Sequence, residues 1–321
     1  MSTIFSEFSL KNLRFRRAEK MSALAKSEAR WGLLFLSPWI LGFLLWTLLP
    51  MLASLAFSFT NYDLLHPDET RWIGLDNYVR FFNDPLVRTS SLVSLRFALI
   101  ALPVGIAQPI VMAALLNSRH LVGKRFFVTM FYMPYIVPLV SAVYIWQGMM
   151  NTRLGWINLA LEAMGVEGPD WLNSTTWIYP ALIIVGLWGV GDMLLYHLAA
   201  MQGIPTELYE AARVDGAGWL ASFRHITLPM ITPVIFYNLV LSFIGIFQYF
   251  IIPFVLTGGT GKPGDTTKFY AMQLYKEAFG YRHMGYAATM AWMLFVAVML
   301  VTVVLFSTHR YWVYYAGGGE R

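Results

Sequence analysis

Residues 209–229 read YEAARVDGAGWLASFRHITLP, a segment with charged residues and a histidine that lies between two long apolar runs, 177–201 and 230–256. A chain crosses lipid only where its backbone polar groups bond one another, as in a helix or a closed barrel. An apolar run of about 20 residues is long enough for one helical crossing. The charged segment therefore joins two membrane-spanning helices and lies at the membrane surface, which predicts an all-α membrane protein.

The composition agrees with a chain that is surrounded by lipid. Hydrophobic residues make up 57% of the sequence and charged residues 13%, about half of the 25% that is typical of soluble domains. The chain has no cysteine, which excludes a disulfide framework, a cysteine-ligated zinc and a thiol nucleophile. Residues 1–30 are basic, and the apolar run that follows is too long for the core of a cleavable signal peptide.

Six segments are long and apolar enough to cross the bilayer. They are residues 31–59, 97–117, 126–150, 177–201, 230–256 and 287–307. The membrane domain is thus expected over 31–307, between a basic segment, 1–30, and a short tail, 308–321. Prolines inside or near the ends of these spans favour kinked helices, because neighbouring helices can satisfy the backbone groups that proline frees. These prolines are Pro38, Pro50, Pro103, Pro109, Pro134, Pro138 and Pro253.

The distribution of basic residues predicts the orientation. Six spans place both termini on one side, and fourteen of the 23 Lys and Arg residues fall on that side, with the strongest excess before the first span. Because positive residues accumulate in cytoplasmic segments, we expect both termini in the cytoplasm. The net charge of +5 follows this topology, so nucleic acid is not an expected partner. The basic cluster within residues 14–20 is predicted to lie along anionic lipid as an interfacial helix.

The sequence contains no recognisable catalytic motif. Residues 258–265, GGTGKPGD, resemble a phosphate-binding loop, but the first glycine position is Leu256 and a proline follows the lysine. A turn after the fifth span is the better interpretation. The six histidines show no metal-ligand spacing, and neither HExxH nor GxSxG is present. We therefore predict a protein without its own catalytic, metal or ATP site.

The first half of the charged segment favours a short helix over residues 205–214. Pro205 suits a first helical position, and Glu210 and Arg213 have the spacing of an i,i+3 ion pair. Gly216 suits the positive φ that often ends a helix.

The second half favours another short helix, which Pro229 is expected to end before the fifth span. Trp219, Phe223 and Ile226 share one apolar face at i, i+4 and i+7. Two interpretations of this helix pair remain open from the residues alone. It is either a structured loop that packs on its own bundle, or a docking element for a cytoplasmic partner.

The segment EAARVDGAGWLASFRHITLP resembles the EAA loop of binding-protein-dependent ABC importer permeases. The matching residues are Glu210, Ala211, Ala212, Asp215, Gly216, Ala217, Ile226, Leu228 and Pro229. In that family the loop is the coupling helix that docks into a cleft of an ATPase subunit. The resemblance therefore implies a coupling loop over 204–229. The implied docking residues are Glu210, Ala211, Ala212, Asp215, Gly216, Trp219 and Phe223.

The resemblance extends over nearly the whole chain. LFLSPWILGFLLWTLLPMLASLAFSFTNYDLL, WIGLDNYVRFFNDP, IPTELYEAA and MGYAATMAWMLF are similar to sugar permeases of the maltose and glycerol-3-phosphate importer type. The resemblance implies a type I ABC importer permease in a bacterial or archaeal inner membrane. It also implies a second permease, two ATPase subunits that bind ATP and magnesium, and an extracytoplasmic solute-binding protein.

Polar residues inside the fifth span are candidates for the solute path, because such residues usually face a bundle interior or a pathway. Asn238, Ser242, Gly245 and Tyr249 fall within about 60° of one another on an ideal helix. Ser and Asn also join helices in packed bundles, so helix packing is the alternative role for this stripe.

Further candidates lie in the fourth and third spans. Trp188 and Asp192 are four residues apart, and aromatic rings and carboxylates are the groups that bind sugar faces and hydroxyls. Family resemblance places sugar contacts on these helices, although Asp192 departs from the small or aromatic residue expected there. Asp192 either binds solute or bonds to Tyr196. Tyr135, between Pro134 and Pro138, is a further candidate.

Two other classes of function compete with the importer permease. A self-sufficient secondary carrier or channel would show inverted repeats and embedded coupling carboxylates, but Asp192 is the one embedded carboxylate and no repeat is evident. A membrane enzyme would need a convergent set of catalytic groups, and none is visible. The solute itself stays open among neutral oligosaccharides, acidic oligosaccharides and glycerol-3-phosphate.

Overall fold

The computed structural model describes residues 22–118 and 120–315, and the regular elements in these two stretches are helices. An isolated antiparallel bridge pairs Thr60 with Trp72. In chain order the elements are α1 (Ala23–Phe43), η2 (Leu44–Leu48), α2 (Leu49–Ser58), η3 (Pro67–Glu69), α3 (Asp76–Asn83), α4 (Pro85–Leu116), α5 (Lys124–Ile136), α6 (Leu139–Met149), α7 (Trp156–Ala163), α8 (Ile178–Trp188), α9 (Gly191–Gln202), α10 (Thr206–Val214), α11 (Trp219–Ser222), η4 (Phe223–Thr227), α12 (Leu228–Met230), α13 (Thr232–Phe247), α14 (Ile251–Thr257), α15 (Tyr270–Tyr275), η5 (Lys276–Gly280), α16 (Met284–Thr308) and η6 (His309–Tyr311).

Four helical stretches are long and apolar enough to cross a membrane, and two bent helix pairs bring the number to six if each pair is one span. The four are Ala23–Ser58, Pro85–Leu116, Thr232–Thr257 and Met284–Tyr311. The bent pairs are α5 with α6, at 102°, and α8 with α9, at 60°. The prediction of an all-helical membrane protein is confirmed. The break in the third span agrees with the kink predicted from Pro134 and Pro138, but the break in the fourth span was not predicted. Pro38, Pro103 and Pro109 lie inside continuous helices.

Several span boundaries differ from the sequence prediction. The second span begins at Pro85 and not at residue 97, because the Asp84 carboxylate caps the helix by accepting a hydrogen bond of 2.8 Å from the Leu86 backbone N–H. The first span begins at Ala23, where the Ser22 hydroxyl caps the Ala25 N–H. The prediction missed these extensions because it ended each span at charged residues such as Arg88. A helix can include charged residues, and α4 does.

The chain divides into two compact units, Met1–Ala56 and Phe57–Arg321. In the first unit the described residues form one apolar helical run, in which Trp39 and Trp46 are 70% and 83% exposed. Lipid is the natural surroundings for such a surface. The basic cluster predicted to be an interfacial helix, residues 14–20, lies outside the described residues.

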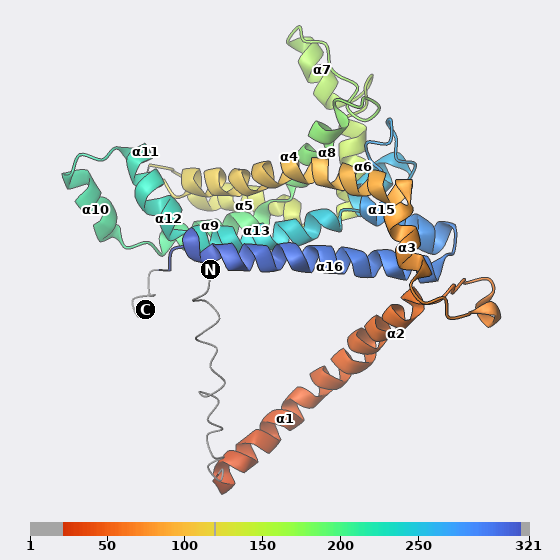
Figure 1. The fold of residues 1–321 in the computed structure, drawn as a ribbon. Helices are drawn as coiled ribbons and strands as arrows, with labels where there is room; N and C mark the ends of the chain where they lie inside the picture. The colour runs from red at the N-terminus through yellow and green to blue at the C-terminus, as the bar shows by residue number, and fades with distance from the viewer. Residues whose placement is uncertain (1–21, 119, 316–321) are drawn as a thin grey trace, which may run out of the picture. The chain divides into compact units, whose positions relative to one another are not determined.

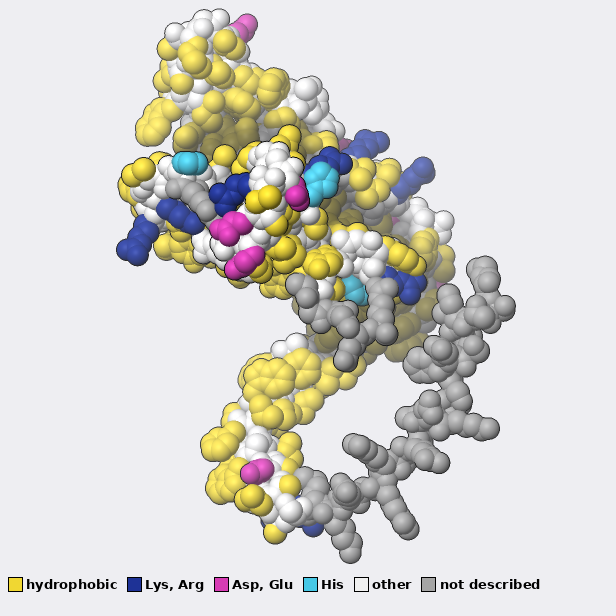
Figure 2. All heavy atoms as spheres, turned by 90° about the vertical axis from the view of Figure 1, so that its left-hand side faces the viewer, with side chains coloured by type: hydrophobic (Ala, Val, Ile, Leu, Met, Phe, Trp, Pro, Cys, Tyr) yellow, Lys and Arg dark blue, Asp and Glu magenta, His cyan; other side chains and the backbone are white. Residues whose placement is uncertain are grey.

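The second unit is a bundle in which α4 packs along both α9 and α13 (Figure 1). Its loops gather at two ends. One end carries α10, α11, α12 and the end of α16, and the other carries α3, α7 and α15. Figure 2 looks onto the α10–α12 end, where basic, acidic and histidine side chains gather among apolar ones. The alternation of loops between two ends is as predicted for this unit, and the cytoplasmic side stays a prediction.

A buried carboxylate organises the end of the bundle that carries α15. The Glu277 side chain is 3% exposed, and its carboxylate lies 3.3 Å from Arg80 Nη2 and 3.0 Å from His283 Nδ1. The Gln273 amide donates a further hydrogen bond of 3.1 Å. The Arg80 guanidinium also lies 3.7 Å from the centre of the Tyr286 ring. Through these contacts the Glu277 carboxylate connects α3, α15 and the start of α16. A buried carboxylate needs such charged and hydrogen-bonding partners, because burial without them is costly.

Replacing Glu277 by alanine is expected to lower the stability of the chain by about 2–3 kcal/mol, because hydrogen bonds to a charged group contribute about 1.5–3 kcal/mol. The measurement is thermal unfolding in detergent, followed by tryptophan fluorescence. Glu167→Ala, which removes an exposed carboxylate from a loop, is the matched control. Equal melting temperatures for the two variants would show that the Glu277 contacts do not stabilise this end.

Candidate solute path and ATPase-docking surface

The fourth span breaks between Trp188 and Asp192. Trp188 is the last residue of α8, Gly189 leaves the helical conformation, and α9 begins at Gly191. Trp188 and Asp192, four residues apart in the sequence, therefore lie on two different helices and are not one turn apart on a single helix. The Leu187 carbonyl, which has lost its partner in the helix, accepts a hydrogen bond of 3.0 Å from the Gln108 amide of α4.

The two residues at this break have different surroundings. The Trp188 ring packs against the Trp146 ring of α6, with centroids 6.1 Å apart. The Asp192 carboxylate accepts a hydrogen bond of 2.7 Å from the Met193 N–H. Within the described stretches no hydrogen bond joins Asp192 to Tyr196, although that bond was one of the two predicted roles.

The structure brings Tyr135 of α5 and Asp192 of α9 together. A side chain on Gly191 would lie 3.0 Å from Tyr135 Cβ and 2.9 Å from the Tyr132 ring, so glycine permits the close approach of α5 and α9. Asp192, Tyr132 and Tyr196 are near enough to Tyr135 for electrostatic interaction with it. The Tyr135 side chain is 49% exposed in this chain, which leaves it available to a ligand or a neighbouring subunit.

The polar residues of the fifth span divide between two environments. Asn238 is 1% exposed, and its Nδ2 lies 3.3 Å from His197 Nδ1 of α9. In this structure Asn238 therefore joins two helices, which is the packing role left open by the sequence. Ser242, one turn further along α13, is half-buried.

Tyr249 is not on the predicted helical stripe, because α13 ends at Phe247 and α14 begins at Ile251. Its ring stacks on Phe97, with centroids 5.1 Å apart, and meets Phe269 edge to face. Its hydroxyl is buried without a hydrogen-bond partner among the described residues. The fifth span thus also contains a break, although Thr232–Thr257 as a whole is long and apolar enough to be one span.

Sequence reasoning missed several residues at these breaks. None of Gln108, Trp146, Tyr132 and Tyr237 was among the candidates predicted from the sequence. The Tyr237 ring packs edge to face on the Tyr196 ring. The available signal was a group of tyrosines in the third, fourth and fifth spans, where apolar side chains are the rule. That signal gives no spatial grouping until the breaks are known.

The charged segment forms the expected helix pair. The carbonyl of Ala212 accepts a hydrogen bond of 2.8 Å from the Ala217 N–H, and Gly216, at φ +78°, occupies the position that ends α10. Glu210 and Arg213 form the predicted i,i+3 pair at 3.9 Å. Pro205, however, precedes α10 as its capping residue and is not its first helical residue.

Pro229 does not end the second helix. The helix continues through η4 and α12, and the Leu228 N–H bonds to the Phe223 carbonyl five residues earlier. This wider π turn directly before Pro229 lets the helix continue without the N–H that proline lacks. The second helix therefore leads into α13 almost without interruption.

The helix pair is anchored on one side and exposed on the other. Tyr209 and Phe223 pack against the core cluster that contains Leu198 and Ile231, and the Tyr209 hydroxyl lies 2.8 Å from the Thr227 hydroxyl. Trp219 stacks on Phe223 but is 67% exposed. The exposed side also carries Glu210, Ala211, Asp215 and Val214.

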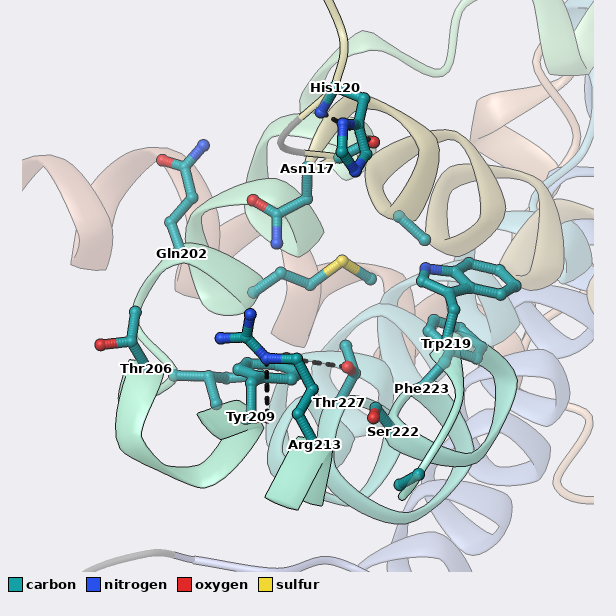
Figure 3. Close-up of a pocket in the computed structure, with 15 residues that line it drawn as sticks. Asn117, His120, Gln202, Thr206, Tyr209, Arg213, Trp219, Ser222, Phe223 and Thr227 are labelled. Carbon is teal, nitrogen blue, oxygen red and sulfur yellow. Dashed lines mark hydrogen bonds between the residues drawn. The ribbon is translucent and has the colours of Figure 1, made fainter. Parts of the chain in front are cut away.

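A cavity of about 560 Å³ lies beside this pair. Figure 3 shows Tyr209 and Arg213 on one side of it, Trp219 on another, and Asn117 and His120 opposite. The helix pair therefore presents an open, partly aromatic surface with charged residues at its rim. Such a surface suits a protein partner.

Together, these features describe a polytopic helical membrane protein with broken spans and a charged helix pair at one end of its bundle. The family model described as "Binding-protein-dependent transport system inner membrane component" matches residues 105–313. The chain belongs to this family.

This chain is similar to known permeases in sequence, and to a solved structure in fold, over most of its length. It is 37% identical to the probable ABC transporter permease protein YesP of Bacillus subtilis, over 94% of this chain and 98% of that protein. It is 31% identical to the arabinooligosaccharides transport system permease protein AraP of the same organism, over 84% and 86%. The fold matches a chain of a bacterial alginate ABC transporter in complex with an alginate pentasaccharide-bound periplasmic protein. That match has a TM-score of 0.76 and 23% identity, and it covers 90% of this chain and 98% of the other.

Family membership settles the class of function. The chain is a permease of a binding-protein-dependent ABC importer, a non-catalytic, multi-pass component of the inner membrane. It has no cofactor of its own, since the partner ATPase binds the nucleotide. The importer hypothesis is thereby favoured over a self-sufficient carrier and over a membrane enzyme.

The contact of Gly191 with α5 predicts opposite effects for two glycine substitutions. Gly191→Ala places a methyl group 3.1 Å from Tyr132 Cα, a backbone atom, and overpacking of this kind costs about 1–3 kcal/mol. Gly186→Ala in α8 meets no atom within 4 Å, so it is expected to be neutral or to stabilise by about 0.5–1 kcal/mol. Melting temperatures of the two purified variants check this, and a stable Gly191→Ala protein would contradict the close packing.

Proposed function

We propose that this chain and a second, similar permease together form the path for a sugar or oligosaccharide, which an extracytoplasmic binding protein delivers. Carbohydrate as the solute class is supported by relatives such as the arabinooligosaccharide permease AraP and the lactose transport system permease LacF of Rhizobium radiobacter, to which this chain is 31% identical. The aromatic and carboxylate groups at the helix breaks support the same class.

The proposed solute site lies at the breaks of the third, fourth and fifth spans. Transporters place solute sites at discontinuous helices, where freed backbone groups and helix ends are available as ligands. Trp188, Asp192 and Tyr135 adjoin the breaks, and Ser242 lies on α13 before the break that holds Tyr249. Asn238 supports the site from behind, through its contact with His197. A second permease would cover the exposed side of Tyr135.

The proposed ATPase-docking surface is the exposed side of α10 and α11. Glu210 and Arg213 are 62% and 57% exposed and 3.9 Å apart, so their pairing is weak and both are free to bind charges on a partner. Ala211 and Ala212 present small side chains next to them, and Asp215 and Trp219 follow across the turn at Gly216. Two ATPase subunits are expected, one for each permease.

Uptake measurements test the solute site. Trp188→Ala and Ser242→Ala are expected to reduce uptake about tenfold or more at low solute concentration, which corresponds to about 1.4 kcal/mol of binding free energy. The assay uses the complete transporter in proteoliposomes, with radiolabelled arabinotriose, lactose and maltose. Trp156→Ala, an exposed residue of α7, is the control. Wild-type uptake by both variants at all concentrations would place the solute path elsewhere.

The turn at Gly216 tests the docking role. Valine at Gly216 must adopt φ +78°, which costs about 1 kcal/mol or more, so Gly216→Val is expected to displace α11 and uncouple ATP hydrolysis from transport. Gly218→Val is the matched control, because Gly218 has φ −75° and no atom within 4 Å of an added Cβ. Glu210→Ala should weaken ATPase binding without affecting membrane insertion.

The readouts are co-purification of the ATPase and stimulation of ATP hydrolysis by sugar-loaded binding protein. Normal stimulation and uptake in both Gly216→Val and Glu210→Ala would mean that the helix pair is a structured loop that does not transmit the signal.

A further inference from the structure

A second polar pocket lies at the end of the bundle that carries α7, away from the helix pair of the coupling loop. It has a volume of about 310 Å³ and lies between the end of α6, the segment before α8 and the segment after α14. This volume is at the lower end of the range for small-molecule sites, about 300–1,000 Å³. By the predicted orientation, this end faces the extracytoplasmic side.

The carboxylate of this pocket is held in place by its neighbours. Asp170 Oδ1 accepts hydrogen bonds from the Thr152 hydroxyl at 3.1 Å and from the Asn173 backbone N–H at 3.2 Å. The Asn173 side-chain amide bonds to both carboxylate oxygens, at 3.0 and 3.2 Å. A carboxylate has about four acceptor positions, so Oδ2, with one partner among the described residues, retains capacity for a ligand hydroxyl.

Three side chains that line the pocket have hydrogen-bond donors without a partner among the described residues. Asn151 Oδ1 accepts from the N–H groups of Arg153 and Leu154, both at 3.0 Å, which fixes the amide and leaves Nδ2 without a partner in the described stretches. Within the same stretches the Gln147 amide makes no hydrogen bond, and the Lys262 ammonium forms no ion pair. Leu256 adds an apolar wall to the pocket.

This combination matches the chemistry of a pyranose ring. Each sugar hydroxyl both donates and accepts, so a carboxylate beside free amide donors satisfies a pair of adjacent hydroxyls. The apolar wall suits the C–H face of the ring. One carboxylate next to a lysine is a poor cation site, because divalent cations prefer several oxygen ligands. The same carboxylate disfavours a phosphate.

We infer that this pocket is a second carbohydrate subsite, which binds one sugar unit of an oligosaccharide outside the proposed solute path, with Gln147, Asn151 and Asp170 as the hydrogen-bonding groups. The inference rests on the proposed function for its solute class. The pocket adjoins the proposed path through α6, because Gln147 follows Trp146, whose ring packs on Trp188.

The absence of cysteine from the chain allows a direct test by alkylation of a single introduced cysteine. Thr260→Cys places the reporter at the exposed rim of the pocket, where the threonine hydroxyl donates to the carbonyl three residues earlier at 2.7 Å. Thr70→Cys is a matched control reporter, because Thr70 is also exposed and makes the same type of bond to Pro67, at 2.6 Å, outside the pocket. The complete transporter in nanodiscs is labelled with a fluorescent maleimide, with both faces accessible.

Maltotriose, arabinotriose and trigalacturonate serve as probes. At least one is expected to slow the labelling of Thr260→Cys about threefold or more and to leave Thr70→Cys unaffected. Gln147→Leu removes an amide that has no partner in the described part of the chain, so the fold should be retained, the labelling rate without sugar should be unchanged, and protection should be lost. Protection that persists in Gln147→Leu, or no protection by any of the three probes, overturns the subsite.

A Trp188→Ala background separates this inference from the proposed solute path. Retained protection of Thr260→Cys in that background supports a distinct subsite, whatever uptake the variant shows. Protection that disappears with Trp188 would mean that the probe binds in the proposed path and acts on residue 260 indirectly, which overturns the separate subsite. Normal uptake by Trp188→Ala together with retained protection would instead reject the proposed path and leave the subsite standing.

Discussion

The Leu187 carbonyl, bonded by the Gln108 amide at 3.0 Å, shows the constraint on which the architecture depends. The hydrocarbon offers no water to bond a backbone group, so a helix that breaks there needs another partner for the groups that it frees, and a neighbouring helix is one source of it. α4 supplies this partner at the break between α8 and α9. The same helix packs along α9 and α13, and it is therefore the scaffold beside which a broken helix remains stable within the membrane.

The break in the fourth span separates Trp188 and Asp192, which a continuous helix would hold one turn apart on the same face. Because α8 and α9 meet at 60°, Trp188 faces α6 while Asp192 faces the end of α5. Gly191 then allows Tyr132 and Tyr135 to approach the α9 backbone. Side chains from the third and fourth spans approach one another at this break in this way.

Much of the topology was predictable from sequence, because apolar run length and charged inserts report directly on the lipid boundary. The turn at Gly216 was equally predictable, since positive φ strongly favours glycine. The grouping of site residues was not, because a helical projection of Asn238, Ser242 and Tyr249 assumes a continuous helix, and α13 ends at Phe247. A hydropathy profile cannot predict the hydrogen bond from Gln108 that permits a break, because it does not describe contacts between helices. It does not describe capping by side chains either, so it does not predict the Asp84 cap that lengthens α4.

The charged helix pair and two of the breaks belong to one pair of helical arms that contact each other. α9 runs from the break at Gly191 to the start of α10, and the helix through η4 leads into α13 and on to the break after Phe247. The two arms are joined by Tyr209 with Thr227, at 2.8 Å, and by His197 with Asn238, at 3.3 Å. The second contact is buried, and because His197 Nδ1 donates to the Met193 carbonyl at 2.8 Å, it joins the arms by packing. The charged segment is therefore connected to both breaks through helices, α9 on one side and α13 on the other.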